Sequence, residues 1–161
     1  FQEIEEIPTS NPNKVWVKCG GGVLKPALLE WAIDKGLTGL EFSSGVPGTV
    51  GGGIYMNAGT KYGCYGDILK ELRFFDFKIG FKQLKREEIH FSYRESEVRN
   101  ALVIWAIFEL KKGDSIEIKQ EVEEILIETE KEGIIIKADT LGGLEALTNL
   151  LKEKKLKIKI L

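Results

Sequence analysis

Glycine is concentrated in one part of the chain, and this uneven distribution constrains the fold more than any other feature. Thirteen of the 18 glycines lie between Gly20 and Gly66. From Thr38 to Gly66 only Glu41 and Lys61 carry a charge. Because glycine has no side chain, its backbone can approach another backbone or a ligand closely. We therefore expect this segment to pack tightly against something rather than to form a solvated surface.

Hydrophobic patterns around the glycine-rich segment predict short strands and helices. Alternation and β-branched or aromatic residues predict strands over 15–18, 69–77 and 102–110. A helix is expected over 26–35, with Pro26 in its first turn and Gly36 as its stop. Asp114, followed by Glu117 at the capping-box spacing, predicts a second helix over 115–126. Three tryptophans are expected in the core: Trp16, Trp31 and Trp105.

The C-terminal part of the sequence has a different composition. Between Lys111 and Leu161, 21 of 51 residues are charged, which is typical of solvated helices and strands. The pattern predicts a strand over 133–138, a helix with a leucine stripe from Leu141 to Leu151, and a strand over 156–160. The lysines of 152–159 then form a solvated face. We predict two domains, residues 1–126 and residues 127–161.

Composition excludes several classes of function. The chain has 161 residues, with 23 basic and 25 acidic side chains and a formal net charge of −2, so no nucleic-acid partner is expected. No apolar run approaches the roughly 20 residues of a membrane helix, and a soluble, cytoplasmic protein is expected. Cys19 and Cys64 are too few for a disulfide framework or a zinc site. Because the chain opens with Phe1 and its only methionine is Met56, we expect it to be cut from something longer.

A run of residues in the glycine-rich segment is the first candidate for chemistry. It comprises Val46, Pro47, Gly48, Thr49, Gly51 and Gly52, followed by Asn57, Ala58 and Gly59. Successive backbone amides in such turns can form a concave nest for anionic oxygen, such as a dinucleotide pyrophosphate. Neither a phosphate loop of the NTPase kind nor a Rossmann spacing is present. Close packing of tight turns remains the other interpretation.

Residues 91–96, Phe-Ser-Tyr-Arg-Glu-Ser, form the second candidate. Arg94 has the planar fork that matches a substrate carboxylate. The alternative is a solvated arginine paired with Glu95 or Glu97. His90, the only histidine, has no partner at catalytic spacing, and a loop or strand position is the simpler interpretation.

These motifs, with residues 36–42 before them, resemble the UDP-N-acetylenolpyruvoylglucosamine reductase (MurB) family over about residues 4–126. The resemblance implies an α+β fold, the second FAD-binding subdomain of the vanillyl-alcohol oxidase/MurB type, with a mixed sheet and flanking helices. It implies FAD as cofactor, NADPH as hydride donor and a UDP-sugar enolpyruvate as substrate. The glycine loop would line the FAD pyrophosphate and residues 57–59 would lie close to the flavin. Arg94 would be catalytic and, with Tyr93, would bind the substrate.

The resemblance also implies parts that this sequence lacks. A first FAD subdomain would precede Phe1, and a substrate domain with a proton-donating serine would follow about Leu126. We therefore expect a fragment that is inactive as given and that needs further domains or a partner chain. We expect Gly51→Val to weaken flavin binding more than it perturbs the fold.

Residues 132–147 resemble a different family, the third domain of archaeal-type translation initiation factor GTPases. That similarity covers about residues 127–161 and implies a structural strand-helix-strand fragment. It predicts a chain that joins two fragments. The alternative function is thus a non-catalytic structural or interaction fragment.

Overall fold

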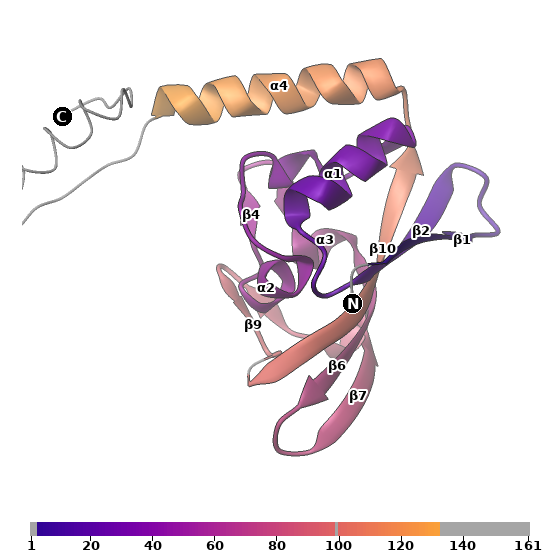
Figure 1. Cartoon of the computed structure of the whole chain (residues 1–161), viewed down its shortest axis with the longest axis vertical. Coiled ribbons are helices and arrows are strands. Elements are labelled where there is room, and N and C mark those ends of the chain that lie inside the picture. Colours follow the sequence, from indigo (N-terminus) through magenta and orange to yellow (C-terminus); the bar gives the residue numbers. More distant parts are fainter. Residues whose placement is uncertain (1–2, 99, 133–161) are drawn as a thin grey trace, which may run out of the picture. The chain divides into compact units, whose positions relative to one another are not determined.

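The structure, a computed structural model, describes residues 3–98 and 100–132 (Figure 1). The chain divides into two compact units, residues 1–125 and residues 126–161. The predicted strand-helix-strand pattern over 133–160 lies outside the described residues. The strands are β1 (Ile4–Pro8), β2 (Lys14–Gly20), β3 (Leu37–Thr38), β4 (Gly59–Thr60), β5 (Gly63–Cys64), β6 (Leu69–Asp76), β7 (Gly80–Lys85), β8 (Phe91–Ser92), β9 (Glu95–Ser96) and β10 (Ala101–Lys112). The helices are α1 (Lys25–Asp34), α2 (Val50–Tyr55), α3 (Tyr65–Ile68) and α4 (Ser115–Glu132), with short helical turns η1 (Glu41–Ser43) and η2 (Arg86–Glu88).

The main sheet is built around β10. Its strand order is β1-β2-β10-β6-β7, and β3 pairs with the end of β10. Every pairing among the described strands is antiparallel, whereas a mixed sheet was expected. The short connections explain the antiparallel pairing of β1 with β2 and of β6 with β7, because a parallel pair needs a long crossover. The α+β class is confirmed.

Strand β10 carries much of the core. Val103, Ala106, Phe108 and Leu110 are buried on it. Its register against β6 shifts between Val103 and Trp105 and again between Ile107 and Phe108. Such bulges bend a strand and re-aim its side chains. They explain why burial along β10 does not follow a strict alternation.

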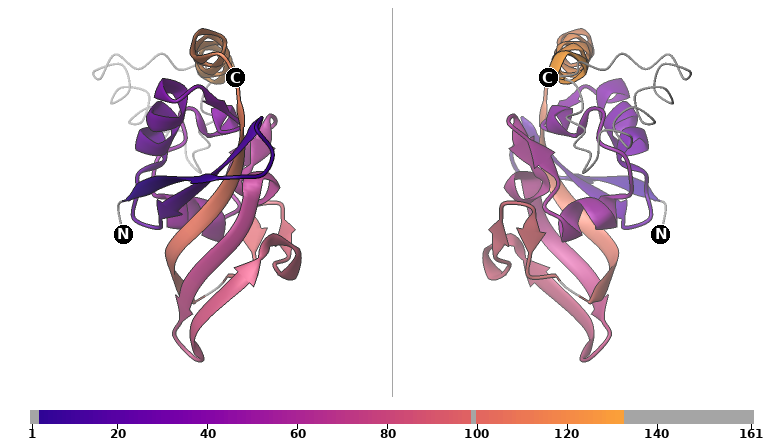
Figure 2. Two further views of the ribbon diagram at one scale, coloured as in Figure 1. Left: turned by 90° about the vertical axis from the view of Figure 1, so that its right-hand side faces the viewer. Right: turned by 90° about the vertical axis from the view of Figure 1, so that its left-hand side faces the viewer.

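Three helices pack beside the sheet. Helix α1 buries Leu28, Leu29 and Ala32 and ends at Gly36, whose φ of +63° favours glycine. Figure 2 shows, from two opposite sides, that the purple helices gather beside the upper part of β10 and that the β6–β7 hairpin extends away from them. The predicted strands and first helix are thus confirmed within a few residues.

Helix α4 begins where the capping pattern predicts. Asp114 Oδ1 accepts hydrogen bonds from the amides of Ile116 at 2.8 Å and Glu117 at 3.2 Å, which satisfies two of the donors that a helix start leaves open. The helix runs to Glu132, beyond the predicted end at Leu126. No helix in the described ranges is long and apolar enough to cross a membrane.

The tryptophans are only half-buried. Trp31 packs against the core cluster, whereas Trp16 and Trp105 are not part of it, so the placement of these two in the core was wrong. Trp16 Nε1 donates to Glu109 at 3.2 Å. Lys35 and Lys18 lie over the rings of Trp31 and Trp105 at 5.9 and 5.3 Å. An indole has a polar edge and a face that attracts cations, so it is stable at the margin of a core.

Candidate functional site

The glycine loop joins η1 to α2 and is fastened to the start of α1. The amide of Lys25 donates to the Gly48 carbonyl at 2.9 Å, and the amide of Val50 donates to Val23 at 2.8 Å. Gly48 has a φ of +106°, a conformation that other residues rarely adopt. The loop therefore needs glycine at this point for its backbone path.

Most amides at the start of α2 are used inside the protein. Those of Val50 and Gly51 donate to backbone carbonyls, and that of Gly52 donates to the Thr49 hydroxyl at 3.2 Å. In the described part of the chain, the amides of Gly48 and Thr49 donate to no protein acceptor. The predicted nest is thus smaller than the motif suggested, with two free donors side by side.

The two glycines that follow serve different purposes. A Cβ on Gly51 would lie 3.0 Å from the Gly21 carbonyl oxygen and 3.2 Å from Val103 Cβ. A Cβ on Gly52 would meet only the Thr49 hydroxyl, at 3.5 Å. Gly51 packs backbone against backbone, so we now expect Gly51→Val to strain the fold as well as the groove. Because Gly52 has no side chain, the surface next to it stays open.

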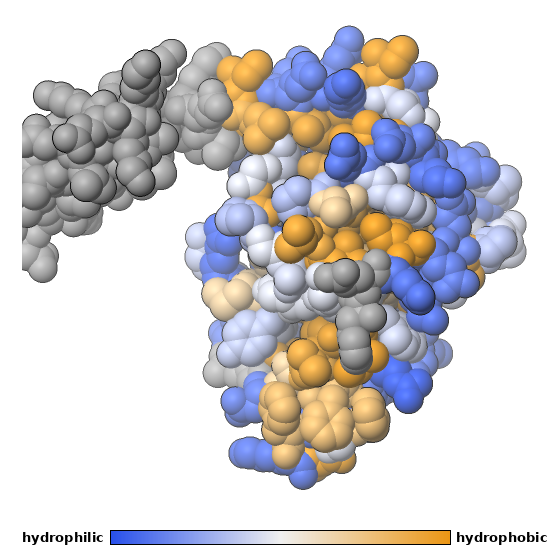
Figure 3. All heavy atoms as spheres, viewed as in Figure 1, coloured by the Kyte–Doolittle hydropathy of each residue, from blue (hydrophilic) through white to orange (hydrophobic). Residues whose placement is uncertain are grey.

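A groove of about 500 Å³ runs along this open surface. Figure 3 shows apolar residues in the middle of this face and over the lower parts of β6, β7 and β10. Tyr55 and Leu102 are among the large exposed apolar side chains. The volume of the groove falls in the range of small-molecule binding sites. The lining residues are Gly21, Gly22, Thr49, Gly51, Gly52, Tyr55, Ala101, Leu102 and Val103.

Arg94 lies at the tip of the β8–β9 hairpin. Its φ of +58° is unusual for a residue other than glycine. The guanidinium lies 5.8 Å from the Tyr93 ring centroid, and both side chains are exposed. A strained backbone at an exposed cation is a pattern that functional sites share. The acid Glu97, one of the predicted ion-pair partners, accepts a hydrogen bond from the His90 amide at 3.0 Å.

Asn57 connects the segment 57–59 to this hairpin. Its Nδ2 donates to the Ser92 carbonyl at 2.9 Å, and its Oδ1 accepts from the Gly66 amide at 3.0 Å. Ala58 is buried, and a Cβ on Gly59 would lie 2.3 Å from the Gly63 carbonyl oxygen. The side chain of Asn57 therefore holds the arginine hairpin in place, with one Nδ2 hydrogen and Oδ1 engaged inside the protein.

We expect Asn57→Asp to destabilise the protein. An aspartate keeps the shape and tolerates the φ of +41°, but it loses the donor and places carboxylate oxygen against the Ser92 carbonyl. The expected loss is about 1–3 kcal/mol in the free energy of unfolding, the cost of an unsatisfied buried group. Urea denaturation measures it. Asn100→Asp is the control, since Asn100 is exposed with a φ of +53°. Equal effects of both changes would contradict the role given to Asn57.

Sequence reasoning missed Lys25, the first residue of α1. It is 5% exposed, and its Nζ lies 3.7 Å from where a Gly48 Cβ would be. Its Cδ lies 3.2 Å from the corresponding position on Gly53. Burial, and then the charge of Arg94, lower the pKa of Lys25. Only the contacts of Lys25 in the folded chain reveal its burial, because a lone lysine at a helix start carries no sequence signal.

Neither cysteine is activated. Cys19 and Cys64 are free thiols. Burial raises the pKa of Cys19 to about 12, and burial with the neighbouring Asp67 raises the pKa of Cys64. Both are therefore protonated at neutral pH. Among the described residues no group of acidic, cysteine and histidine side chains is arranged to hold a metal.

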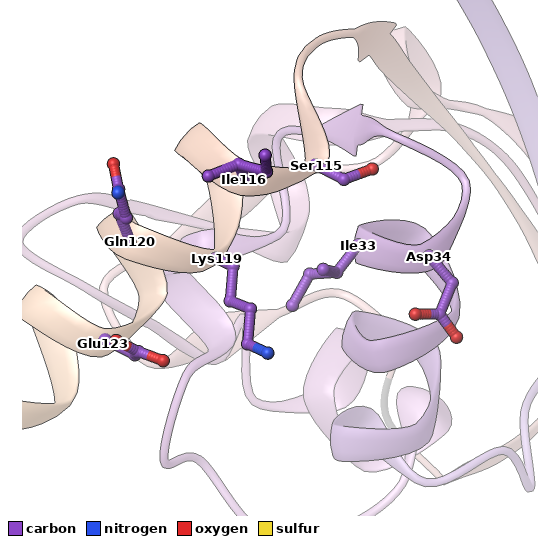
Figure 4. Close-up of a pocket in the computed structure, with 7 residues that line it drawn as sticks. All are labelled: Ile33, Asp34, Ser115, Ile116, Lys119, Gln120 and Glu123. Carbon is purple, nitrogen blue, oxygen red and sulfur yellow. The ribbon is translucent and has the colours of Figure 1, made fainter.

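A second hollow lies between the end of α1 and the first turns of α4. Figure 4 shows Ile33 and Asp34 facing Ser115 and Lys119 across it. It has a similar volume of about 500 Å³, but none of the predicted site residues lines it. Its mixed, solvent-open lining offers no arrangement for catalysis.

Comparison with known proteins gives a consistent match. Residues 1–79 match the family model described as FAD binding domain. The UDP-N-acetylenolpyruvoylglucosamine reductase of Moorella thermoacetica is 41% identical over 103 residues, which are 63% of this chain and 34% of that protein. The same enzyme of Geobacillus kaustophilus is 34% identical over 125 residues, 73% of this chain and 41% of that protein.

A solved structure agrees with these relatives. The crystal structure of MurB from Thermus caldophilus is similar with a TM-score of 0.65 and 30% sequence identity. The match covers 87% of this chain and 54% of that chain. This chain spans about a third of the length of the first curated relatives.

These matches do not show the similarity of residues 127–161 to an initiation factor, and the alternative function drawn from it is not supported. Residues 133–161 also lie outside the described part of the chain. The sequence and structural matches together show that the matched part of this chain is homologous to a segment of the UDP-N-acetylenolpyruvoylglucosamine reductases and includes an FAD-binding domain.

Proposed function

We propose that this chain supplies the second FAD-binding subdomain of a UDP-N-acetylenolpyruvoylglucosamine reductase. One observation carries the proposal. Thr49, whose amide is free, lines a groove whose wall at Gly52 has no side chain, and the free amide of Gly48 directly precedes it in the chain. That combination suits a ligand with phosphates and a flat ring system better than it suits a purely structural turn.

The residues present fit the cofactor. The two free amides suit a phosphate oxygen, because paired backbone donors in a turn bind anions. The apolar floor of the groove around Leu102 and Val103 suits a stacked ring. Pro47 is exposed on the loop, whereas Val46 packs partly against the core. Ala58 and Gly59 are packed inside, so we assign them the support of the loop rather than a contact through side chains.

Arg94 is the residue that we propose to act on substrate. When bound, FAD supplies the transfer of a hydride from NADPH to the enolpyruvyl group of the UDP-sugar. The guanidinium of Arg94 remains charged and presents a two-point fork to a carboxylate. Placed at a hairpin tip, it can meet the carboxylate of the enolpyruvyl group and stabilise charge that grows there during reduction. Tyr93 flanks the same contact.

The chain alone is not expected to turn over. The matched segment spans only about a third of the length of its relatives, and the proton donor that the family resemblance implies has no counterpart in this sequence. Losing a general acid typically costs 10² to 10⁴ in rate. We propose that further domains, or a partner chain that carries them, complete the site. The free thiols favour a cytoplasmic setting, and the net charge of −2 favours a protein without a nucleic-acid partner.

Titration with FAD tests the proposal. We expect the chain to alter flavin fluorescence and to bind FAD at least about tenfold more tightly than riboflavin, a difference of about 1.4 kcal/mol. Riboflavin lacks the pyrophosphate that the free amides are proposed to hold. Equal affinities for both would contradict the phosphate contact. No binding of either flavin would contradict the proposed function.

A further inference from the structure

Lys25 is in an unusual position for a lysine. Its side chain is 5% exposed, whereas lysines are almost never buried without a partner. None of the ion pairs among the described residues includes a carboxylate for its ammonium group. The neighbouring charge that acts on it is a second cation, Arg94. Lys25 Nζ is not among the enclosed side-chain atoms that lack a hydrogen-bond partner, so the buried stem carries an ammonium group that reaches the surface and is open to an anion.

The surroundings of Lys25 leave space for a ligand on one side of its ammonium group. Its aliphatic stem packs on Gly53, and its Cε and Nζ lie 3.6 and 3.7 Å from the Cβ position of Gly48. Gly48 itself is exposed, and its amide is one of the two free donors of the loop. Nζ therefore lies beside Gly48, and the amides of Gly48 and Thr49 are the free donors of the same turn.

The arginine hairpin reaches the same helix. Ser96 Oγ of β9 donates to the Tyr55 carbonyl at the end of α2 at 2.9 Å, and Lys25 packs on Gly53 in the middle of α2. Lys25 and the arginine hairpin thus contact α2 from different elements, and the two free amides directly precede it. An anionic oxygen group is the ligand that suits an unpaired ammonium and free amides together.

We propose that Lys25 is the buried anchor of an anion subsite, formed by its ammonium group with the free amides of Gly48 and Thr49 and flanked by Arg94. The anion is a phosphate of the cofactor or a carboxylate of the substrate. This identification of the anion rests on the proposed function. Lys25 is a positioning residue, since it holds the anion and takes no part in bond making. The simpler interpretation is a lysine whose stem fills space and whose ammonium is solvated.

A set of variants separates these interpretations. Lys25→Met keeps an unbranched stem of similar length on Gly53 and removes the charge. Lys25→Arg keeps the charge. Lys82→Met is the matched control, because Lys82 is exposed on β7. Thermal unfolding of the whole chain is measured with and without inorganic pyrophosphate, and affinities for pyrophosphate, pyruvate, FAD and riboflavin are measured by calorimetry.

We expect Lys25→Met to unfold at a temperature equal to or above that of the wild type when no anion is present, since the stem is kept and the repulsion between Lys25 and Arg94 is removed. We expect its affinity for at least one anion to fall about tenfold or more, as for loss of a charge-assisted contact. Lys25→Arg should retain most of the affinity, and Lys82→Met should change neither property. Loss of pyrophosphate and FAD binding with riboflavin unchanged identifies a phosphate. Loss of pyruvate binding alone identifies a carboxylate.

Other results would overturn the proposal. A Lys25→Met protein that unfolds at a lower temperature and binds every anion as the wild type does would leave Lys25 a space-filling residue. A wild type that binds neither pyrophosphate nor pyruvate would show that no anion subsite exists. Binding of pyrophosphate without binding of FAD would count against the proposed function and leave the subsite standing.

Discussion

Replacing Gly52 with valine is expected to abolish FAD binding while the fold remains intact. The new side chain has space, because a Cβ there meets only the Thr49 hydroxyl at 3.5 Å. Valine is also a better helix residue than glycine, so the free energy of unfolding should stay equal or rise slightly. Its methyl groups would occupy the wall of the groove where the cofactor must lie. We expect a loss of a few kcal/mol in FAD affinity, about a hundredfold or more.

The neighbouring Gly51→Val is the matched contrast. Its side chain would press on the Gly21 carbonyl oxygen and Val103, so we expect destabilisation of about 1–3 kcal/mol from overpacking, and more if the backbone must move. Thermal unfolding and a FAD titration on both variants measure the two effects. If Gly52→Val binds FAD as the wild type does, the groove is not the cofactor site. If Gly51→Val is as stable as the wild type, the close packing at Gly21 has been misjudged.

The regular elements were predictable because local signals agree there. Pro26 and Gly36 bracket α1, and Asp114 caps α4 through two hydrogen bonds. The length of β10 and its two register shifts were not predictable. Bulges depend on how a strand fits both neighbours, and a single strand's sequence does not contain that information.

The glycine loop shows how far a motif can be interpreted. Its pattern predicted an anion nest and close packing as alternatives, and the glycines differ in their surroundings. Gly51 and Gly59 face protein backbone, whereas Gly48 meets only the end of the Lys25 side chain and Gly52 meets only the Thr49 hydroxyl. No sequence rule separates these cases, because the difference depends on Gly21 and Gly63, which the fold brings close.

Charge was the least predictable property of the site. Arg94 stood out because it lies between aromatic and hydroxyl residues, but Lys25 is one of many lysines. Its burial arises only when α2 packs across the start of α1, with Gly53 leaving room for the stem. A buried cation that sequence patterns do not reveal is thus a consequence of tertiary packing.

Replacing Arg94 with lysine is expected to slow substrate reduction much more than flavin reduction. The measurement needs a version of the chain completed with the remaining domains of a relative. Lysine tolerates the φ of +58° no worse than arginine and keeps the charge, so the change removes mainly the two-point fork. If Arg94 stabilises charge that grows on the substrate carboxylate, the rate of flavin oxidation by substrate should fall about 10² to 10³, the cost of losing one such donor. The rate of flavin reduction by NADPH should change little.

Arg86→Lys gives the contrast that a structural arginine should show. The Arg86 side chain donates to the carbonyls of Gly66 and Ile89 and lies over the Phe91 ring at 4.7 Å, so it supports the hairpin from inside. Its replacement should lower the free energy of unfolding and affect both half-reactions alike. Stopped-flow absorbance of the flavin follows each half-reaction separately. If Arg94→Lys behaves like Arg86→Lys, with both steps slowed equally, then Arg94 supports the fold or the flavin and does not act on substrate.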